Sequence, residues 1–273
     1  MKGDSELKTY IITSAQASYH VNKDGDKLPH GGGKVGKAPA NKNFLRGLET
    51  LRDTLDAELK IIPIAGKNTL ENILHNDFNG RDDIFNGSLQ RLNGNLQIRD
   101  LLCPPQNVDP TTGKGDLVAK YGSSIIFAHS KQRFLPVPVA HADLPRYLFT
   151  TGAVTEPNYN TANSRGDSAE RNHVHGAIVV EVIDEVFFNI RNIRSLVNGK
   201  FADMGVAFNG RRKPGKMKVD TLVLGDLHWG DHDLNAIEAN YEMIEHFKPK
   251  RIVLHDLFNG HSINHHEKEN YLM

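Results

Sequence analysis

The opening of the chain alternates between short apolar runs and one stretch with helical spacing. Apolar residues cluster over residues 9–13 and again over 59–64, and runs of this length are typical of strands. Between the two runs, five large apolar residues recur at the spacing of one helix face: Phe44, Leu45, Leu48, Leu51 and Leu55. The order strand, helix, strand predicts an α/β unit near the N-terminus.

The middle of the chain is rich in residues that favour turns. Asn, Asp, Gly and Pro are frequent over residues 75–116, where we expect loops and short strands. Strands or extended segments are expected at 123–128, 134–139 and 177–183, and the polar segment 156–172 is expected to be a loop. No internal sequence repeat is evident.

The C-terminal part has the clearest pattern. An apolar run over 219–224 predicts a strand, and a second run over 251–254 predicts another. Between them, Asp231 or Asp233 can cap a helix that runs to about Phe247. One face of that helix is apolar and contains Leu234, Ile237, Tyr241 and Ile244. This is the pattern of a βαβ unit, so we expect the two strands to be parallel and joined by a right-handed crossover.

A change of composition near residue 209 divides the chain. Residues 209–218 are basic, contain Gly and Pro and have no apolar anchor, which is typical of a linker. The length of 273 residues exceeds the common size of one domain. We therefore expect an N-terminal α/β domain of unassigned function over 1–208, a basic linker over 209–218 and a second domain over 219–273.

Composition excludes several classes of protein. Lys and Arg together number 33, as do Asp and Glu, so there is no global attraction to nucleic acid and any basic surface must be local. The single cysteine excludes an intramolecular disulfide framework. The polar N-terminus does not resemble a signal peptide, and no apolar run approaches the roughly 18 residues that span a bilayer. We expect a cytoplasmic protein without membrane contact.

Candidate metal ligands follow each of the two C-terminal strands. Asp226 and His228 follow the first strand, and Asp256 follows the second. Adjacent parallel strands lie roughly 5 Å apart and present their carboxyl ends at one edge of the sheet, where ligands bind in open α/β folds. Two carboxylates held close together repel unless a cation compensates them, and carboxylates with an imidazole suit Mn²⁺, Fe or Zn²⁺. The sequence therefore predicts a metal site and phosphoester chemistry.

Two short blocks carry a family resemblance. Asp226-Leu227-His228-Trp229-Gly230 and Asp256-Leu257-Phe258 resemble the first two blocks of calcineurin-like metallophosphoesterases, above all those of the SbcD-type nuclease branch. The resemblance implies that residues 219–273 form the opening βαβ unit of a metallophosphoesterase sheet. The chain as a whole, with its long region ahead of the blocks, also resembles early host-DNA-degrading proteins of tailed coliphages, which would act in the host cytoplasm.

The resemblance also implies a site and a reaction. Asp226 and His228 would bind the first of two divalent ions, and Asp256 would bridge both. Mn²⁺ is the preferred ion, with Mg²⁺ and Zn²⁺ as alternatives. The reaction would be metal-assisted hydrolysis of DNA phosphodiesters, with DNA as the partner.

The chain departs from the family pattern after the second strand. His255 stands where the family has Gly, and Asn259 stands where it has a catalytic His, for which His261 is a candidate substitute. Members of the family have further blocks of metal ligands later in the sequence. Residues 264–267 resemble one of them but follow Asp256 too closely, and residues 173–175 contain a His-x-His outside the family order. We therefore expect a truncated metallophosphoesterase domain with an incomplete site.

The basic run before the first block has two interpretations. Arg211, Arg212, Lys213 and Lys216 either form a solvated linker or contact the phosphates of DNA. Two other functions stay open for the whole chain. One is a phosphodiesterase or phosphatase for small substrates, and the other is a non-catalytic binding or assembly module with a vestigial metal site. Assembly into a homo-oligomer is open as well.

Overall fold

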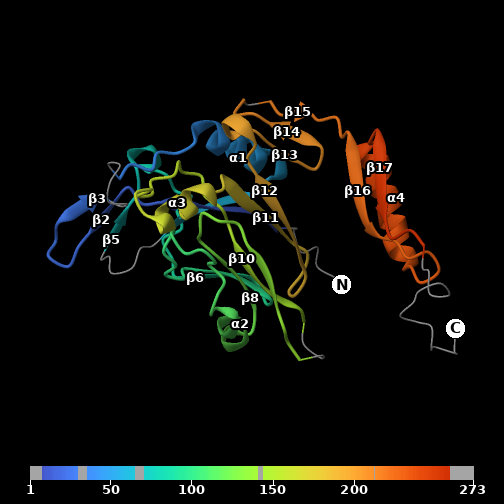
Figure 1. The fold of residues 1–273 in the computed structure, drawn as a ribbon, viewed down its shortest axis with the longest axis horizontal. Coiled ribbons are helices and arrows are strands. Elements are labelled where there is room, and N and C mark those ends of the chain that lie inside the picture. Colours follow the sequence, from blue (N-terminus) through green and yellow to red (C-terminus); the bar gives the residue numbers. More distant parts are fainter. Residues whose placement is uncertain (1–7, 30–35, 65–70, 141–143, 212, 259–273) are drawn as a thin grey trace, which may run out of the picture. The chain divides into compact units, whose positions relative to one another are not determined.

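The computed structural model describes residues 8–29, 36–64, 71–140, 144–211 and 213–258 of a mixed α/β chain. The chain divides into two compact units (Figure 1). Unit 1 comprises residues 1–203 and 207–215, and unit 2 comprises residues 204–206 and 216–273. None of the described helices is both long and apolar enough to cross a membrane.

The described residues form four α-helices and seventeen short or medium strands, together with two 3-10 turns. The helices are α1 (Lys42–Leu55), α2 (Gly115–Tyr121), α3 (Ser164–Arg171) and α4 (Leu234–Phe247). The strands are β1 (Lys8–Gln16), β2 (Tyr19–Val21), β3 (Lys27–Pro29), β4 (Glu58–Ile64), β5 (Glu71–Ile73), β6 (Leu89–Asn93), β7 (Leu96–Arg99), β8 (Ser124–Phe127), β9 (Phe134–Val137), β10 (Arg146–Thr150), β11 (Gly176–Val182), β12 (Phe188–Arg194), β13 (Phe201–Asp203), β14 (Val206–Phe208), β15 (Gly215–Lys216), β16 (Thr221–Asp226) and β17 (Arg251–His255).

Unit 1 contains two mixed sheets. The first has the order β12-β11-β1-β4, in which β1 is parallel to β4 and antiparallel to β11. The second has the order β6-β7-β8-β10-β9, with β7, β8 and β10 parallel to one another. Strand β1 is central in its sheet, and its residues from Ile11 to Gln16 are all buried, so both of its faces are covered.

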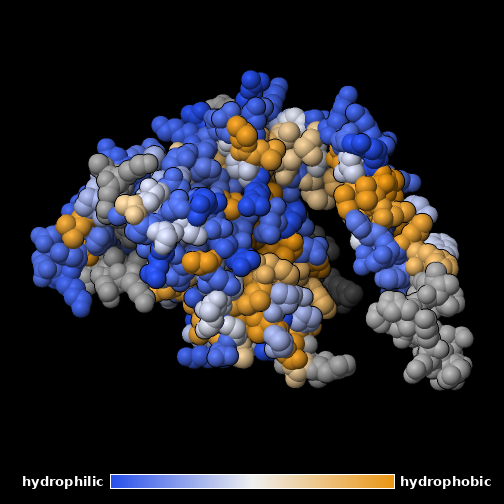
Figure 2. Space-filling model, viewed as in Figure 1, coloured by the Kyte–Doolittle hydropathy of each residue, from blue (hydrophilic) through white to orange (hydrophobic). Residues whose placement is uncertain are grey.

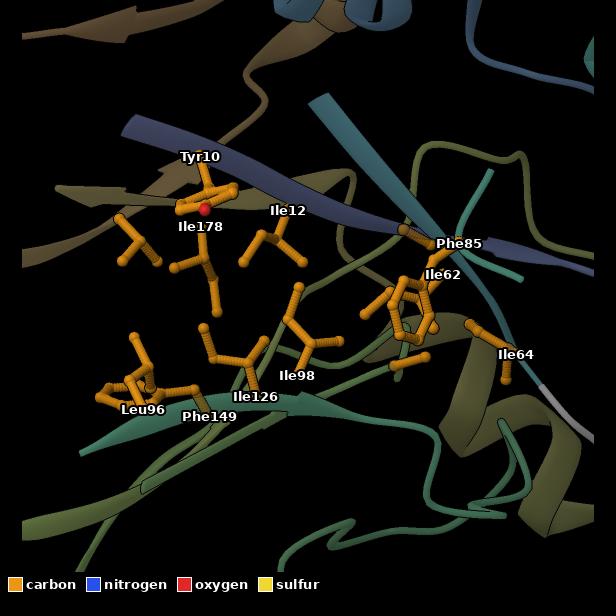
Figure 3. Packing of buried hydrophobic residues seen from close by; sticks show 13 residues of the cluster. Tyr10, Ile12, Ile62, Ile64, Phe85, Leu96, Ile98, Ile126, Phe149 and Ile178 are labelled. Carbon is orange, nitrogen blue, oxygen red and sulfur yellow. The ribbon is translucent and has the colours of Figure 1, made fainter. Parts of the chain in front are cut away.

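The core of unit 1 lies between these two sheets. Alternate residues of a strand point to opposite faces, so each sheet contributes every second side chain to the shared layer. Figure 3 shows Tyr10, Ile12 and Ile178 of the first sheet opposite Ile126 and Phe149 of the second. The packed apolar layer explains how strands far apart in the sequence are held together.

Helix α1 confirms the helix predicted from apolar spacing. Its N-cap Asn41 accepts a hydrogen bond from the backbone N–H of Phe44, which satisfies one of the unpaired donors of the first turn. Phe44, Leu48 and Leu51 form the buried face. The helix ends at Asp56, whose left-handed backbone (φ 49°) directs its N–H to the carbonyl of Arg52.

Unit 2 contains the predicted βαβ arrangement. Strands β16 and β17 are parallel, with Thr221 paired to Arg251, and α4 connects them. Asp233 is the N-cap of α4 and accepts hydrogen bonds from two backbone N–H groups of the first turn. Lys248 ends the helix in a left-handed conformation. The prediction of two parallel strands joined by a helix is therefore confirmed.

Two local expectations differ from the structure. The polar segment 156–172, expected to be a loop, contains α3, an eight-residue helix whose polar sequence has no apolar period. Asn163 caps it by accepting from the N–H of Gly166. The expected linker 209–218 contributes β15 to the sheet β13-β14-β15. Backbone pairing forms β15 without apolar side chains, which is why composition did not reveal it.

Candidate metal centre

The candidate centre lies where the loops after β16 and β17 run side by side. Three backbone hydrogen bonds continue the parallel pairing beyond the strand ends. They run from the N–H groups of Leu227, His228 and Trp229 to the carbonyls of His255, Asp256 and Leu257, at 3.1, 2.8 and 2.9 Å. These bonds hold the two ligand-bearing loops in register, so the positions of the side chains depend on backbone pairing rather than on side-chain packing.

Both loops pass through the left-handed region of backbone conformation at a candidate ligand. His228 has φ 46° and Asp256 has φ 37°. A residue with a Cβ atom pays roughly 1–2 kcal/mol for this conformation, although Asp and His adopt it more often than most others. Strained residues of this kind gather at ligand sites because the conformation redirects a side chain. Here the strain occurs at two of the three candidate ligands.

The three side chains converge. Asp226, His228 and Asp256 each offer one ligand atom, and these atoms all lie within 4.8 Å of one another. Two ligands on one divalent ion are separated by up to about 4.4 Å, twice a bond of about 2.2 Å. All three residues are exposed. The spacing is compatible with a divalent ion after small side-chain rotations, and the donor set of two carboxylates and an imidazole suits Mn²⁺ or Zn²⁺.

An aromatic pair lies next to the first ligand block. The rings of Trp229 and His232 are stacked, with centroids 4.4 Å apart and planes inclined by 22°. The N–H of Gly230 donates to Nδ1 of His232 at 3.2 Å, so the proton of the neutral ring lies on Nε2. Sequence reasoning did not assign a role to this pair, although the closeness of Trp229 and His232 to Asp226 in the chain was a usable signal.

The other predicted site residues are divided between the two units or lie outside the described residues. Arg211 and Lys213 belong to unit 1 and Lys216 belongs to unit 2, and all three are exposed. Arg212 and the candidate catalytic residue His261 lie outside the described residues.

The His-x-His of the sequence lies in unit 1 within a buried polar network. Ser130 donates to the hydroxyl of Tyr159 (2.6 Å), which donates to Nδ1 of His173 (3.1 Å). Nε2 of His173 then donates to the carbonyl of Thr155 at 2.8 Å. Burial raises the pKa of Tyr159. Burial and, to a smaller extent, the adjacent His175 lower the pKa of His173 to about 3. Both ring nitrogens of His173 are therefore committed to structural bonds.

His129 lies near the same network and is almost completely buried. Its Nδ1 accepts from the N–H of Lys131 at 3.0 Å, whereas its buried Nε2 makes no hydrogen bond of normal geometry with the described residues. Burial lowers the pKa of His129 to about 4, and the charges of Lys114 and Lys131 act in the same direction. Within the described parts of the chain, Asp226, His228 and Asp256 are the group of three that meets the geometry of a metal site, and these imidazoles do not.

The chain has a distant relative among characterised proteins. It is 26% identical over 281 residues to Protein A1 of Escherichia phage T5. The aligned segment covers 96% of this chain and 46% of that protein, so the chain spans about half the length of its relative. No protein-family model matches the chain, and no solved structure matches it. The relative agrees with the expected similarity to phage proteins, and the metallophosphoesterase resemblance continues to rest on the two short blocks.

Proposed function

We propose that Asp226, His228 and Asp256 hold divalent metal ions and that the protein contributes to metal-dependent hydrolysis of DNA phosphodiesters. The observation that carries the proposal is the convergence of three ligand atoms within 4.8 Å, from loops that follow adjacent parallel strands. Two acidic groups placed so close together repel each other in the absence of a cation. Backbone strain at His228 and Asp256 adds support, because strain is retained where a fixed side-chain direction is useful.

Each residue has a distinct part in the proposed site. Asp226 and His228 would bind from the first loop, and Asp256 would bind from the second; the family resemblance gives Asp256 the bridging role. When bound, divalent ions would supply charge stabilisation and activation of water for attack on phosphorus. The backbone bonds between the loops hold the two ligand-bearing backbones in register, which supports a site whose side chains need only small rotations to bind an ion.

DNA is the proposed substrate class for two reasons. The two blocks resemble the nuclease branch of the metallophosphoesterases more closely than its other branches. Trp229, which is 57% exposed and stacked on the half-buried His232, also offers an aromatic surface next to His228 in the chain, on which a base can stack.

The test is Mn²⁺-dependent cleavage by the purified chain. Plasmid, linear DNA and bis-nitrophenyl phosphate are compared as substrates for wild type, Asp256→Asn and Glu238→Gln. Asn keeps the shape of the side chain and tolerates left-handed backbone, while Glu238→Gln makes the same charge change on the exposed surface of α4. We expect slow DNA cleavage that Asp256→Asn loses and Glu238→Gln retains. Cleavage of the small substrate alone would instead favour a small-substrate phosphodiesterase.

The exposure of all three ligands favours a second candidate function, a non-catalytic binding or assembly module. Catalytic metal sites are usually enclosed, because exclusion of water strengthens the electrostatic interactions on which they depend. The second function would be selected if the chain binds Mn²⁺ but shows no Asp256-dependent cleavage at any Mn²⁺ concentration.

A further inference from the structure

Two Asn-Gly turns of unit 1 pack against the first turn of α1. Gly199 and Gly210, the second residues of these turns, have positive φ angles of 74° and 72°. A Cβ added to Gly199 would lie 3.0 Å from Cβ of Asn43, and a Cβ added to Gly210 would lie 3.1 Å from Cα of Asn43. The side chain of Asn43 also donates to the carbonyl of Asn198 at 3.2 Å. Both turns are therefore fixed on the helix through close backbone approaches that need glycine.

Each turn brings a cation to α1. Lys200 follows the first turn and Arg211 follows the second. The carbonyl of Arg211 accepts a hydrogen bond from the hydroxyl of Thr50 at 3.3 Å, which holds this backbone against the helix. Lys42 and Arg46 are exposed and stand one turn apart on α1, so they share a face of the helix. Three separate segments of unit 1 thus contribute cations to one surface.

This surface is hollowed along the helix. One hollow of about 480 Å³ lies over the first turn of α1 and is lined by Lys42 and Lys200 among others. A second hollow of about 700 Å³ follows residues 46–54 and is lined by Arg46 and Arg211 among others. The surface along residues 41–54, between the turns at 198–199 and 209–211, is termed the α1 groove. A helix of 14 residues is about 21 Å long, which sets the length of the groove.

The carboxylates of the α1 groove already have partners. Glu49 forms an ion pair with Arg81 at 2.7 Å. Asp53 forms one with Arg52, also at 2.7 Å, and Glu156 accepts from the side-chain amide of the N-cap residue at 2.9 Å. Four cations of the groove have no ion pair within the described parts of the chain: Lys42, Arg46, Lys200 and Arg211. The groove is therefore a local positive surface on a chain that has no net charge.

The side chains that line the α1 groove suit phosphates rather than bases. Among the described residues, none of those lining either hollow is aromatic, so a base has no ring on which to stack. Figure 2 shows that the visible face of unit 1 is largely hydrophilic. Phosphates of one DNA strand recur about every 3.4 Å along the duplex axis, so a groove about 21 Å long can face about six of them.

We propose that the α1 groove binds the phosphate backbone of duplex DNA without reading its sequence, so that unit 1 helps to hold the substrate. The choice of DNA among polyanions rests on the proposed function, whereas the binding of a polyanion rests on the cations of the groove. Arg211, already a candidate contact from the sequence, acts there with Lys42, Arg46 and Lys200, which the sequence did not single out. Each bound phosphate releases counterions, so binding weakens as salt is raised.

The proposal is tested by titrating a fluorescent DNA duplex of about 20 base pairs, roughly three times the length of the groove, with the complete 273-residue chain. EDTA withholds divalent ions, so the DNA stays intact and the result does not depend on the metal centre. Wild type is compared with Arg46→Gln/Arg211→Gln. The control Lys23→Gln/Arg91→Gln removes two exposed cations elsewhere on unit 1.

We expect Arg46→Gln/Arg211→Gln to bind at least about tenfold more weakly at about 0.1 M salt, where charges more than about 10 Å apart are screened. The slope of log affinity against log salt should become shallower by about 2, equally for two unrelated DNA sequences. The control pair should bind as wild type does. Lys42→Gln/Lys200→Gln, in the other hollow, should repeat the effect, so the result does not depend on the folding of one variant.

Several outcomes would overturn the proposal. They are no binding of the duplex by wild type, equal weakening by the control pair, and unchanged binding by both groove variants. Binding of polyglutamate but not of DNA would also overturn it, since the groove would then suit an acidic polypeptide. Mn²⁺-dependent cleavage is measured separately. Its absence, together with groove-dependent binding in EDTA, would refute the proposed function and leave the α1 groove as a site for polyanions.

Discussion

Acidification should destabilise unit 1 through its buried imidazoles. The pKa of His129 is lowered to about 4 in the folded protein, whereas an imidazole in the unfolded chain titrates near 6.5. The unfolded state therefore binds a proton more readily, and folding stability falls as the pH drops from about 6.5 toward about 4. At pH 5 the unfolded imidazole is charged and the folded one is largely neutral. The resulting loss is about 2 kcal/mol relative to pH 7.5 for His129 alone.

His173 acts in the same direction, because its folded pKa is about 3, and it adds at most a similar amount at pH 5. The loss of stability within unit 1 is measured by urea unfolding at pH 7.5 and pH 5, with hydrogen exchange of peptides from β1 and β8 as the probe. In His129→Gln the free energy of unfolding should differ between pH 7.5 and pH 5 by about 2 kcal/mol less than in wild type, whatever the variant does to absolute stability. Equal stability of wild type at both pH values, or an unchanged difference in the variant, would refute the account.

Three further predictions test packing and strain, each measured by urea unfolding. Gly152→Ala should destabilise the protein by at least about 2 kcal/mol, because φ is 78° and an added Cβ would lie 2.7 Å from Cα of Gly176. The control Gly25→Ala is also at positive φ but has open space around it, so it should cost only about 1 kcal/mol. Equal effects of the two substitutions would contradict the close approach at Gly152. Ile126→Ala should cost about 2–5 kcal/mol by opening a cavity between the two sheets, and a loss below 1 kcal/mol would mean that the sheets do not share this core. In metal-free buffer, Asp256→Gly should be more stable than Asp256→Ala by about 1 kcal/mol, since glycine adopts positive φ freely, and the reverse order would argue against the left-handed conformation.

Local patterns explain what the sequence could predict. In unit 2 the apolar runs of β16 and β17, the cap at Asp233 and the period of α4 all lie within about forty residues, and each is a local signal. The meeting of Asp226 and Asp256 follows from the parallel pairing of consecutive strands. Their convergence was therefore predictable, whereas the left-handed backbone at His228 and Asp256 was not, because neither residue type requires it.

Long-range pairing explains what the sequence could not predict. Strand β11 was expected as a strand, but its antiparallel place beside β1, more than 160 residues earlier, depends on the packing of two sheets rather than on any local pattern. The same holds for the bonds that join Ser130, Tyr159 and His173, which come from three separate segments. Helix α3 was missed because its side chains are mostly polar and show no apolar face, although Asn163 was a usable cap signal.

The central claim is that the loops after β16 and β17 form one cation site. Mn²⁺ is titrated with the protein, and the loss of the electron paramagnetic resonance signal of free Mn²⁺ is recorded. This measures the Mn²⁺ affinity of the site without requiring turnover. We expect saturable binding in wild type and in Glu238→Gln, and at least about a tenfold weaker affinity in Asp256→Asn. Binding that is absent from the wild-type chain, or equally strong in Asp256→Asn, would contradict the account.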